Sequence, residues 1–165
     1  MKKLLTVLIA VCLTFTLFAQ NSKALDEKYG FREAKFETSF YLFKNLQEVE
    51  KSYYKSTTED LKLGRYALDE IYYGFYKNQL STIFIKTKGY INSKGILSIL
   101  QQAYGQGSQD NQYIEEYMWF GDKVGMVYRQ NSITDGATVM MFSIKLMNSK
   151  EADEKQEAAS AVKDL

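Results

Sequence analysis

The chain contains no histidine and no proline in its 165 residues. The absence of histidine excludes Ser-His-Asp and Cys-His catalysis, as well as zinc or copper sites built on imidazole ligands. The absence of proline is unusual, because proline makes up about 5% of an average protein. Any enzymatic function would have to use another nucleophile, and we expect no catalytic residue, bound metal or cofactor.

Cysteine occurs once, at Cys12, inside a segment that has the three parts of a secretory signal. Lys2 and Lys3 precede an uncharged apolar stretch over residues 4–18, and Ala19 supplies the small residue for cleavage. The stretch is shorter than the roughly 20 apolar residues of a membrane-spanning helix. We therefore predict a signal peptide over 1–19 and a periplasmic or secreted protein. The alternative is a lipoprotein attached through Cys12, although Val11 is a poor residue to precede a lipid-attached cysteine.

The predicted mature chain, residues 20–165, has 146 residues, enough for one domain with a hydrophobic core. Without Lys2 and Lys3, 19 basic residues face 20 acidic ones, a net charge of −1. This balance gives no electrostatic basis for binding nucleic acid or an anionic membrane. With Cys12 removed, no disulfide can form, so packing has to supply the stability. We expect no transmembrane segment after signal cleavage.

Aromatic residues make up 15% of the chain, led by thirteen tyrosines, and this richness favours β-sheet. We predict a polar, flexible lead-in over 20–30, a single domain over 31–147 and a polar helical tail over 148–165. Within the domain, a helix near 39–48 precedes three strands, and a helix near 93–104 precedes three more. The predicted strands span 49–57, 66–76, 80–87, 113–120, 124–131 and 137–147. The expected fold is α+β: an antiparallel sheet of about six strands from two αβββ repeats, with both helices on one face.

This element order is similar to that of the β-lactamase inhibitor protein family, whose tandem helix-plus-three-strand repeats grip another protein. The chain also resembles small uncharacterised secreted proteins of Gram-negative bacteria. The residues that carry this resemblance are Phe36, the segment 71–76, Tyr104-Gly105 and Trp119. This resemblance covers roughly residues 31–147, and its motifs are packing motifs, whereas the likeness to the inhibitor family concerns element order only. The chain lacks the disulfides of such inhibitors, and no functional residue is carried over.

Two local patterns resemble a phosphate-binding loop and a catalytic carboxylate pair, but neither fits the geometry that such chemistry needs. Gly105-Gln106-Gly107-Ser108 follows a helix, whereas a phosphate loop joins a strand to a helix and ends in Lys-Ser or Lys-Thr. Glu115 and Glu116 point to opposite faces of a strand and cannot act as a catalytic pair. Both segments are expected to be ordinary loop and strand-end positions.

The uncovered face of the predicted sheet is the candidate binding site. If Ile71, Tyr73 and Phe75 face the helices, the alternating residues point outward and form an aromatic surface. We predict that this surface comprises Tyr72, Tyr76, Phe84, Tyr117 and Trp119, and that it binds a protein or an envelope glycan. Tyr and Trp dominate protein-binding hot spots. Other interpretations stay open: the face assignment could be inverted, another segment could cover the surface, or the chain could be a small histidine-free periplasmic enzyme or a structural envelope protein.

Overall fold

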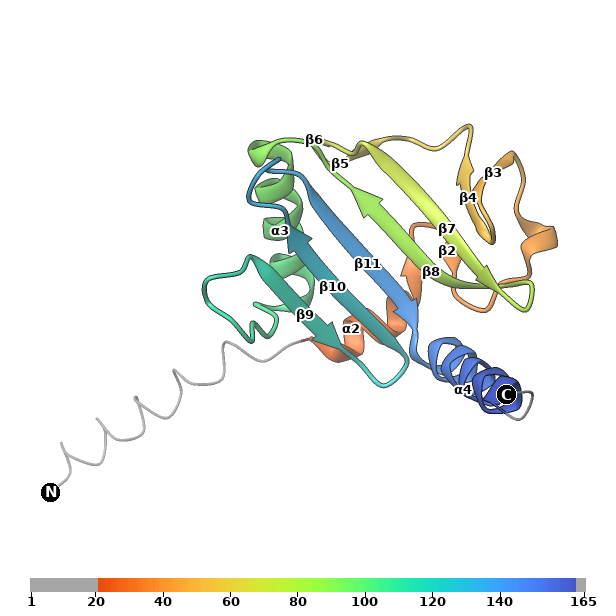
Figure 1. The fold of residues 1–165 in the computed structure, drawn as a ribbon. Coiled ribbons are helices and arrows are strands. Elements are labelled where there is room, and N and C mark those ends of the chain that lie inside the picture. Colours follow the sequence, from red (N-terminus) through yellow and green to blue (C-terminus); the bar gives the residue numbers. More distant parts are fainter. Residues whose placement is uncertain (1–20, 163–165) are drawn as a thin grey trace, which may run out of the picture.

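The computed structural model describes residues 21–162, so the predicted signal peptide and Cys12 lie outside the described residues. Its central feature is a seven-stranded antiparallel sheet in a mixed α+β fold (Figure 1). The strands follow the order β3-β4-β7-β8-β11-β10-β9 across the sheet. Their bounds are β3 Leu46–Glu50, β4 Tyr53–Ser56, β7 Glu70–Tyr76, β8 Gln79–Lys86, β9 Glu116–Phe120, β10 Val124–Gln130 and β11 Ala137–Ser143.

Within the described residues, three α-helices accompany the sheet: α2 (Ser22–Lys28), α3 (Tyr90–Tyr104) and α4 (Ile144–Ala161). Helices α2 and α3 lie on one side, behind β9, β10 and β11 in Figure 1, and α4 extends from the end of β11. Two small ribbons complete the fold. They pair β1 (Gly30–Phe31) with β2 (Ala34–Lys35), and β5 (Lys62–Leu63) with β6 (Tyr66–Ala67).

The predicted hairpin of β7 and β8 is confirmed, and its turn together with one bulge sets its register. Lys77 and Asn78 both have positive φ angles, of 48° and 60°. Two such residues form the two-residue turn whose twist matches that of the flanking strands. The turn places Phe75 opposite Leu80, and a one-residue register shift between Phe75 and Gly74 then brings Ile71 opposite Ile85 and Tyr73 opposite Ile83 on one face of the sheet.

The hydrophobic core lies between this face and helices α2 and α3. It contains Ile71, Tyr73, Ile83 and Ile85 from the hairpin, Ile96, Leu97 and Leu100 from α3, Leu25 from α2, and Val124, Met126, Tyr128, Val139, Met141 and Trp119 from the later strands. Helix α3 ends where Gly105 adopts a φ of 83°, which residues other than glycine rarely adopt. The sheet thus has a covered face and, opposite α2 and α3, an outer face.

The predicted helix over 39–48 is wrong. Phe40–Leu42 form only one 3-10 turn, and Leu46–Glu50 form the edge strand β3. The aromatic spacing that indicated a helix has another cause, because the rings of Phe40 and Phe43 both pack edge-on against Phe75. The two αβββ repeats are therefore not present as expected, and the sheet has seven strands instead of six.

Both ends of the expected domain also differ from the prediction. Residues of the expected lead-in form α2, in which Leu25 is fully buried and Asn21 caps the first turn by accepting a hydrogen bond from the Ala24 amide. At the other end, β11 stops at Ser143, whose hydroxyl accepts a hydrogen bond from the Leu146 amide and caps α4. Helix α4 therefore begins four residues before the predicted tail.

Candidate outer-face binding site

A continuous row of apolar side chains crosses the outer face. Tyr72, Phe84, Met140, Val127 and Met118 lie directly opposite one another on β7, β8, β11, β10 and β9. All five are half-buried. Neighbouring strands are about 4.8 Å apart, so this outer row is about 19 Å long. The outer face of an antiparallel sheet is ordinarily polar, whereas this row of the outer face is apolar throughout.

Two aromatic rings lie flat on the outer face beside the outer row because glycines leave room for them. A Cβ atom at Gly74 would meet the Tyr53 ring at 2.7 Å, and one at Gly125 would meet the Phe142 ring at 2.2 Å. Tyr53 also approaches Phe84, with ring centroids 5.9 Å apart and planes inclined by 57°. Phe120 is 48% exposed, and its ring centroid lies 6.4 Å from that of Phe142.

Charged side chains form a rim along one side of the outer row. Glu70, Lys86, Thr138, Arg129 and Glu116 lie opposite one another in the next row of the same face. Lys86 pairs with Glu70 at 3.5 Å, and Arg129 pairs with Glu116. A hydrogen bond to Glu70 and partial desolvation raise the pKa of the Tyr72 hydroxyl to about 12, so Tyr72 is neutral at physiological pH.

The structure places three of the five predicted site residues on the outer face. Tyr72 and Phe84 belong to the outer row, while Tyr76 lies beside α4 and donates a hydrogen bond to the Asp153 carboxylate. Trp119 is wrong as a contact residue: it is 1% exposed, and its indole N–H donates to the Gly105 carbonyl at 2.8 Å. Tyr117 is half-buried on the same covered face, against Tyr128.

The alternation of β9 was predicted with the faces inverted, because both sides of this strand are apolar. Tyr117 and Trp119 alternate with Met118 and Phe120, so periodicity alone cannot choose the buried pair. The same reasoning missed Tyr53, Val127, Met140 and Phe142, which belong to the outer face. Aligning β10 with β11 as an antiparallel hairpin would have identified Val127, Met140 and Phe142, since Val127 then lies opposite Met140.

The outer face carries two cavities that meet at the Tyr53–Phe84 pair. The first, of about 440 Å³, is lined by Val49, Glu50, Tyr53, Tyr72, Phe84 and Lys86. The second, of about 280 Å³, lies between the sheet and the first turns of α4, and Tyr53 and Phe84 also line it. Cavities of this size suit small molecules or single side chains of a partner.

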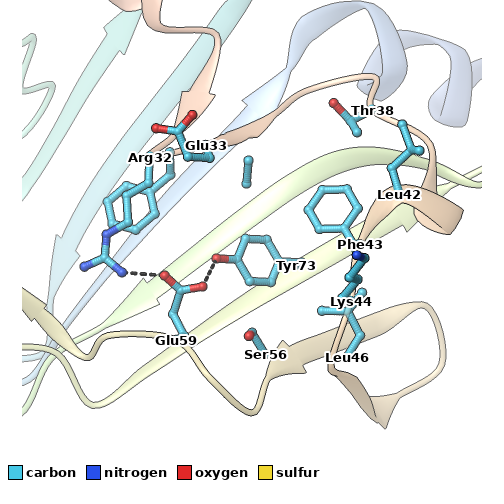
Figure 2. A pocket seen from close by; sticks show the side chains of 12 residues that line it. Arg32, Glu33, Thr38, Leu42, Phe43, Lys44, Leu46, Ser56, Glu59 and Tyr73 are labelled. Atoms are coloured by element: carbon cyan, nitrogen blue, oxygen red, sulfur yellow. Dashed lines mark hydrogen bonds and ion pairs between the residues drawn. The ribbon is translucent and has the colours of Figure 1, made fainter.

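A third cavity, of about 480 Å³, lies beneath the β1–β2 hairpin and the Phe40–Leu42 turn (Figure 2). At its polar end, Glu59 accepts hydrogen bonds from Arg32 and, at 2.7 Å, from the Tyr73 hydroxyl. Burial, together with Glu59, raises the pKa of Tyr73 well above its usual range. Arg32 also donates to the backbone carbonyls of Asp60 and Lys62. These groups satisfy one another's hydrogen-bonding capacity and fix the segment 59–62 in place, so we assign the cluster a structural role.

Within residues 21–162, no three His, Cys, Asp or Glu side chains come together in a way that could hold a metal ion. None of the helices in that range is long and apolar enough to cross a membrane. Comparisons of the chain with protein-family models, with curated proteins and with solved structures found no match.

Proposed function

We propose that this chain is an exported, non-catalytic binding module that holds a partner protein on the outer face of its sheet. The observation that supports this function best is the outer row, which runs uninterrupted across five strands on the face opposite α2 and α3. Contiguous exposed apolar surface on a soluble domain commonly marks an interaction site. Export through the predicted signal over 1–19 would place the module in the periplasm or outside the cell.

The arrangement of the outer face favours a protein over a glycan. Its apolar centre and charged rim match the usual anatomy of a protein interface. Methionines at two positions of the outer row supply adaptable contact surface. The aromatic rings are mutually inclined, by 57° between Tyr53 and Phe84 and by 68° between Phe120 and Phe142. They therefore do not form one flat platform on which a chain of sugar rings could stack.

A triple substitution of Tyr72, Val127 and Phe142 by serine tests this function. These side chains come from three different strands of the outer face, so their loss removes its apolar centre while the core stays intact. The matched control replaces three side chains that are exposed elsewhere: Tyr41 (78%), Tyr113 (88%) and Ile133 (91%). Affinity capture from an envelope extract, read by quantitative mass spectrometry, measures partner retention, and thermal unfolding measures the fold.

We expect the unchanged protein and the control triple to capture the same partner, and the Tyr72, Val127 and Phe142 triple to lose it while remaining folded. Retention of the partner by this triple would contradict the proposal. If the triple variant unfolds, the outer-face side chains are part of the core, and this result would also contradict the proposal. If glycosidase treatment of the extract abolishes capture and protease treatment does not, the partner is a glycan and the assignment to a protein is wrong.

A further inference from the structure

The cleft of about 280 Å³ between α4 and the outer face is formed by elements that the sequence places in direct succession. Because Ser143 caps α4 at the end of β11, the first turn of the helix lies immediately beside the sheet. Met147 on that turn approaches the outer-face residue Thr82, with 3.9 Å between its sulfur and the Thr82 hydroxyl. Phe84 and Met140 also line the cleft, so its walls combine aromatic and thioether groups.

The charged residues that line this cleft are lysines. Lys51 is exposed on the β3–β4 turn, and Lys150 projects from the second turn of α4, while no carboxylate among residues 21–162 lines the cleft. Lys150 is weakly paired with Glu154 at 3.9 Å. Asp153, the other nearby acid on α4, is already bound by Lys77 and Tyr76. Glu50 lines the adjoining cavity of about 440 Å³, so the positive charge is confined to the cleft itself, where Lys51 and Lys150 can meet an anion.

We propose that this cleft binds a fatty acid, with its carboxylate between Lys51 and Lys150 and its alkyl chain over Met140, Met147 and Phe84. The cavity of about 440 Å³ adjoins the cleft, because Tyr53 and Phe84 line both spaces. Flexible, polarisable methionine side chains adapt to an alkyl chain more readily than branched ones. This inference goes beyond the proposed function, since the occupant is a small molecule and the site lies at the α4 end of the outer face.

The chain carries its own reporters for this binding. Of its six methionines, Met140 and Met147 line the cleft, whereas Met126 and Met141 are buried in the core on the covered face. Protein labelled with ¹³C at the methionine methyl groups would be titrated with dodecanoate below its micelle concentration and followed by NMR. We expect saturable shifts of the Met140 and Met147 resonances and little change at Met126 and Met141. Shifts of equal size at all four, or none at Met140 and Met147, would overturn the proposal.

Three probes that share one alkyl tail but differ in head group test whether the cleft selects a carboxylate. We expect dodecanoate to bind at least ten-fold more tightly than dodecyltrimethylammonium or dodecyl maltoside, because only the carboxylate meets both lysines. Equal affinity for the three would show that the cleft selects no anion, contrary to the proposal. Dodecyl phosphate is the fourth arm: if it binds ten-fold more tightly than dodecanoate, the ligand is a phosphate-bearing lipid and the assignment to a fatty acid is wrong.

Charge reversal of both cleft lysines, by Lys51→Glu with Lys150→Glu, should weaken dodecanoate binding at least ten-fold and leave dodecyl maltoside binding unchanged. The control double variant, Lys23→Glu with Lys155→Glu, has the same net charge and alters lysines whose side chains are 87% and 74% exposed outside the cleft. An equal loss of dodecanoate affinity in both double variants would mean that only the overall charge matters, and it would overturn the proposed site. Neither double touches Tyr72, Val127 or Phe142, so partner capture can succeed or fail independently of this result.

Discussion

At the scale of single residues, Asp26 explains how a short polar segment becomes a helix docked on the sheet. Its carboxylate accepts hydrogen bonds from three successive amides of the β9–β10 turn, those of Asp122 at 2.7 Å, Lys123 at 2.9 Å and Val124 at 3.0 Å. The turn also needs Gly121, because a Cβ there would lie 2.2 Å from the carboxylate. Burial raises the pKa of Asp26, but the three amide hydrogen bonds outweigh it, and the net pKa is lowered below 3.8.

We expect Asp26→Asn to reduce the free energy of unfolding at pH 7 by about 1–3 kcal/mol, because it removes a charged acceptor from three amides. The folded-state pKa is depressed, so this contribution is complete above the ordinary value of 3.8 and is lost as the pH falls through the lower folded-state pKa. Urea unfolding at pH 7 and at pH values below 3.8 should show the difference between the two proteins shrinking with acidity.

The control for this prediction is Glu27→Gln, which alters the neighbouring side chain, an exposed one paired with Lys23 at 3.7 Å. An exposed pair of this kind is worth about 0–1 kcal/mol. A difference for Asp26→Asn that does not change with pH would contradict the linkage. No local pattern could have predicted this contact, since Asp26 and the amides it binds are separated by 96 to 98 residues along the chain.

At the scale of elements, the sequence predicted those that carry a clear period and a recognisable end. The β7–β8 hairpin and α3 satisfied both conditions, through Lys77-Asn78 and Gly105. The segment 39–48 did not, because spacing by three among aromatic residues is also produced by rings that converge on one partner, here Phe75. Two of the five candidate site residues were assigned to the wrong face for a related reason, since β9 is apolar on both sides.

Helix α4 divides into a docked first part and a solvated remainder, and the two should contribute differently to stability. Leu146 is 5% exposed, whereas residues 151–162 are exposed throughout. Among the described residues, a deletion of 151–165 removes only exposed side chains such as Asp153, so we expect the melting temperature to fall by less than about 3 °C. Leu146→Ala should instead cost about 2–5 kcal/mol. Thermal and urea unfolding of both variants would check this, and a larger effect of the deletion would contradict it.

At the scale of the whole molecule, the sheet is two antiparallel halves joined along one seam. Strands β3, β4, β7 and β8 come from the first half of the chain, and β9, β10 and β11 from the second, so only the β8–β11 pairing connects them within the sheet. A chain of hydrogen bonds closes one end of this seam. The Ala137 amide donates to the Thr87 hydroxyl at 3.0 Å, Thr87 and Ser93 are joined at 2.7 Å, and Ser93 donates to the Asp135 carbonyl at 2.7 Å.

This seam gives the last prediction, which is that Thr87→Val weakens the junction of the two halves. Valine keeps the shape of the buried threonine but leaves the Ala137 amide without that acceptor, so we expect a loss of about 1–3 kcal/mol in urea unfolding. Hydrogen exchange at the Ala137 amide should accelerate, while exchange in the β3–β4 pair stays unchanged. Thr138→Val is the control, because Thr138 is half-exposed on the outer face one residue further along β11. Equal effects of the two variants would mean that hydroxyl loss in general, and not the hydrogen-bond chain at the seam, sets the stability of the junction.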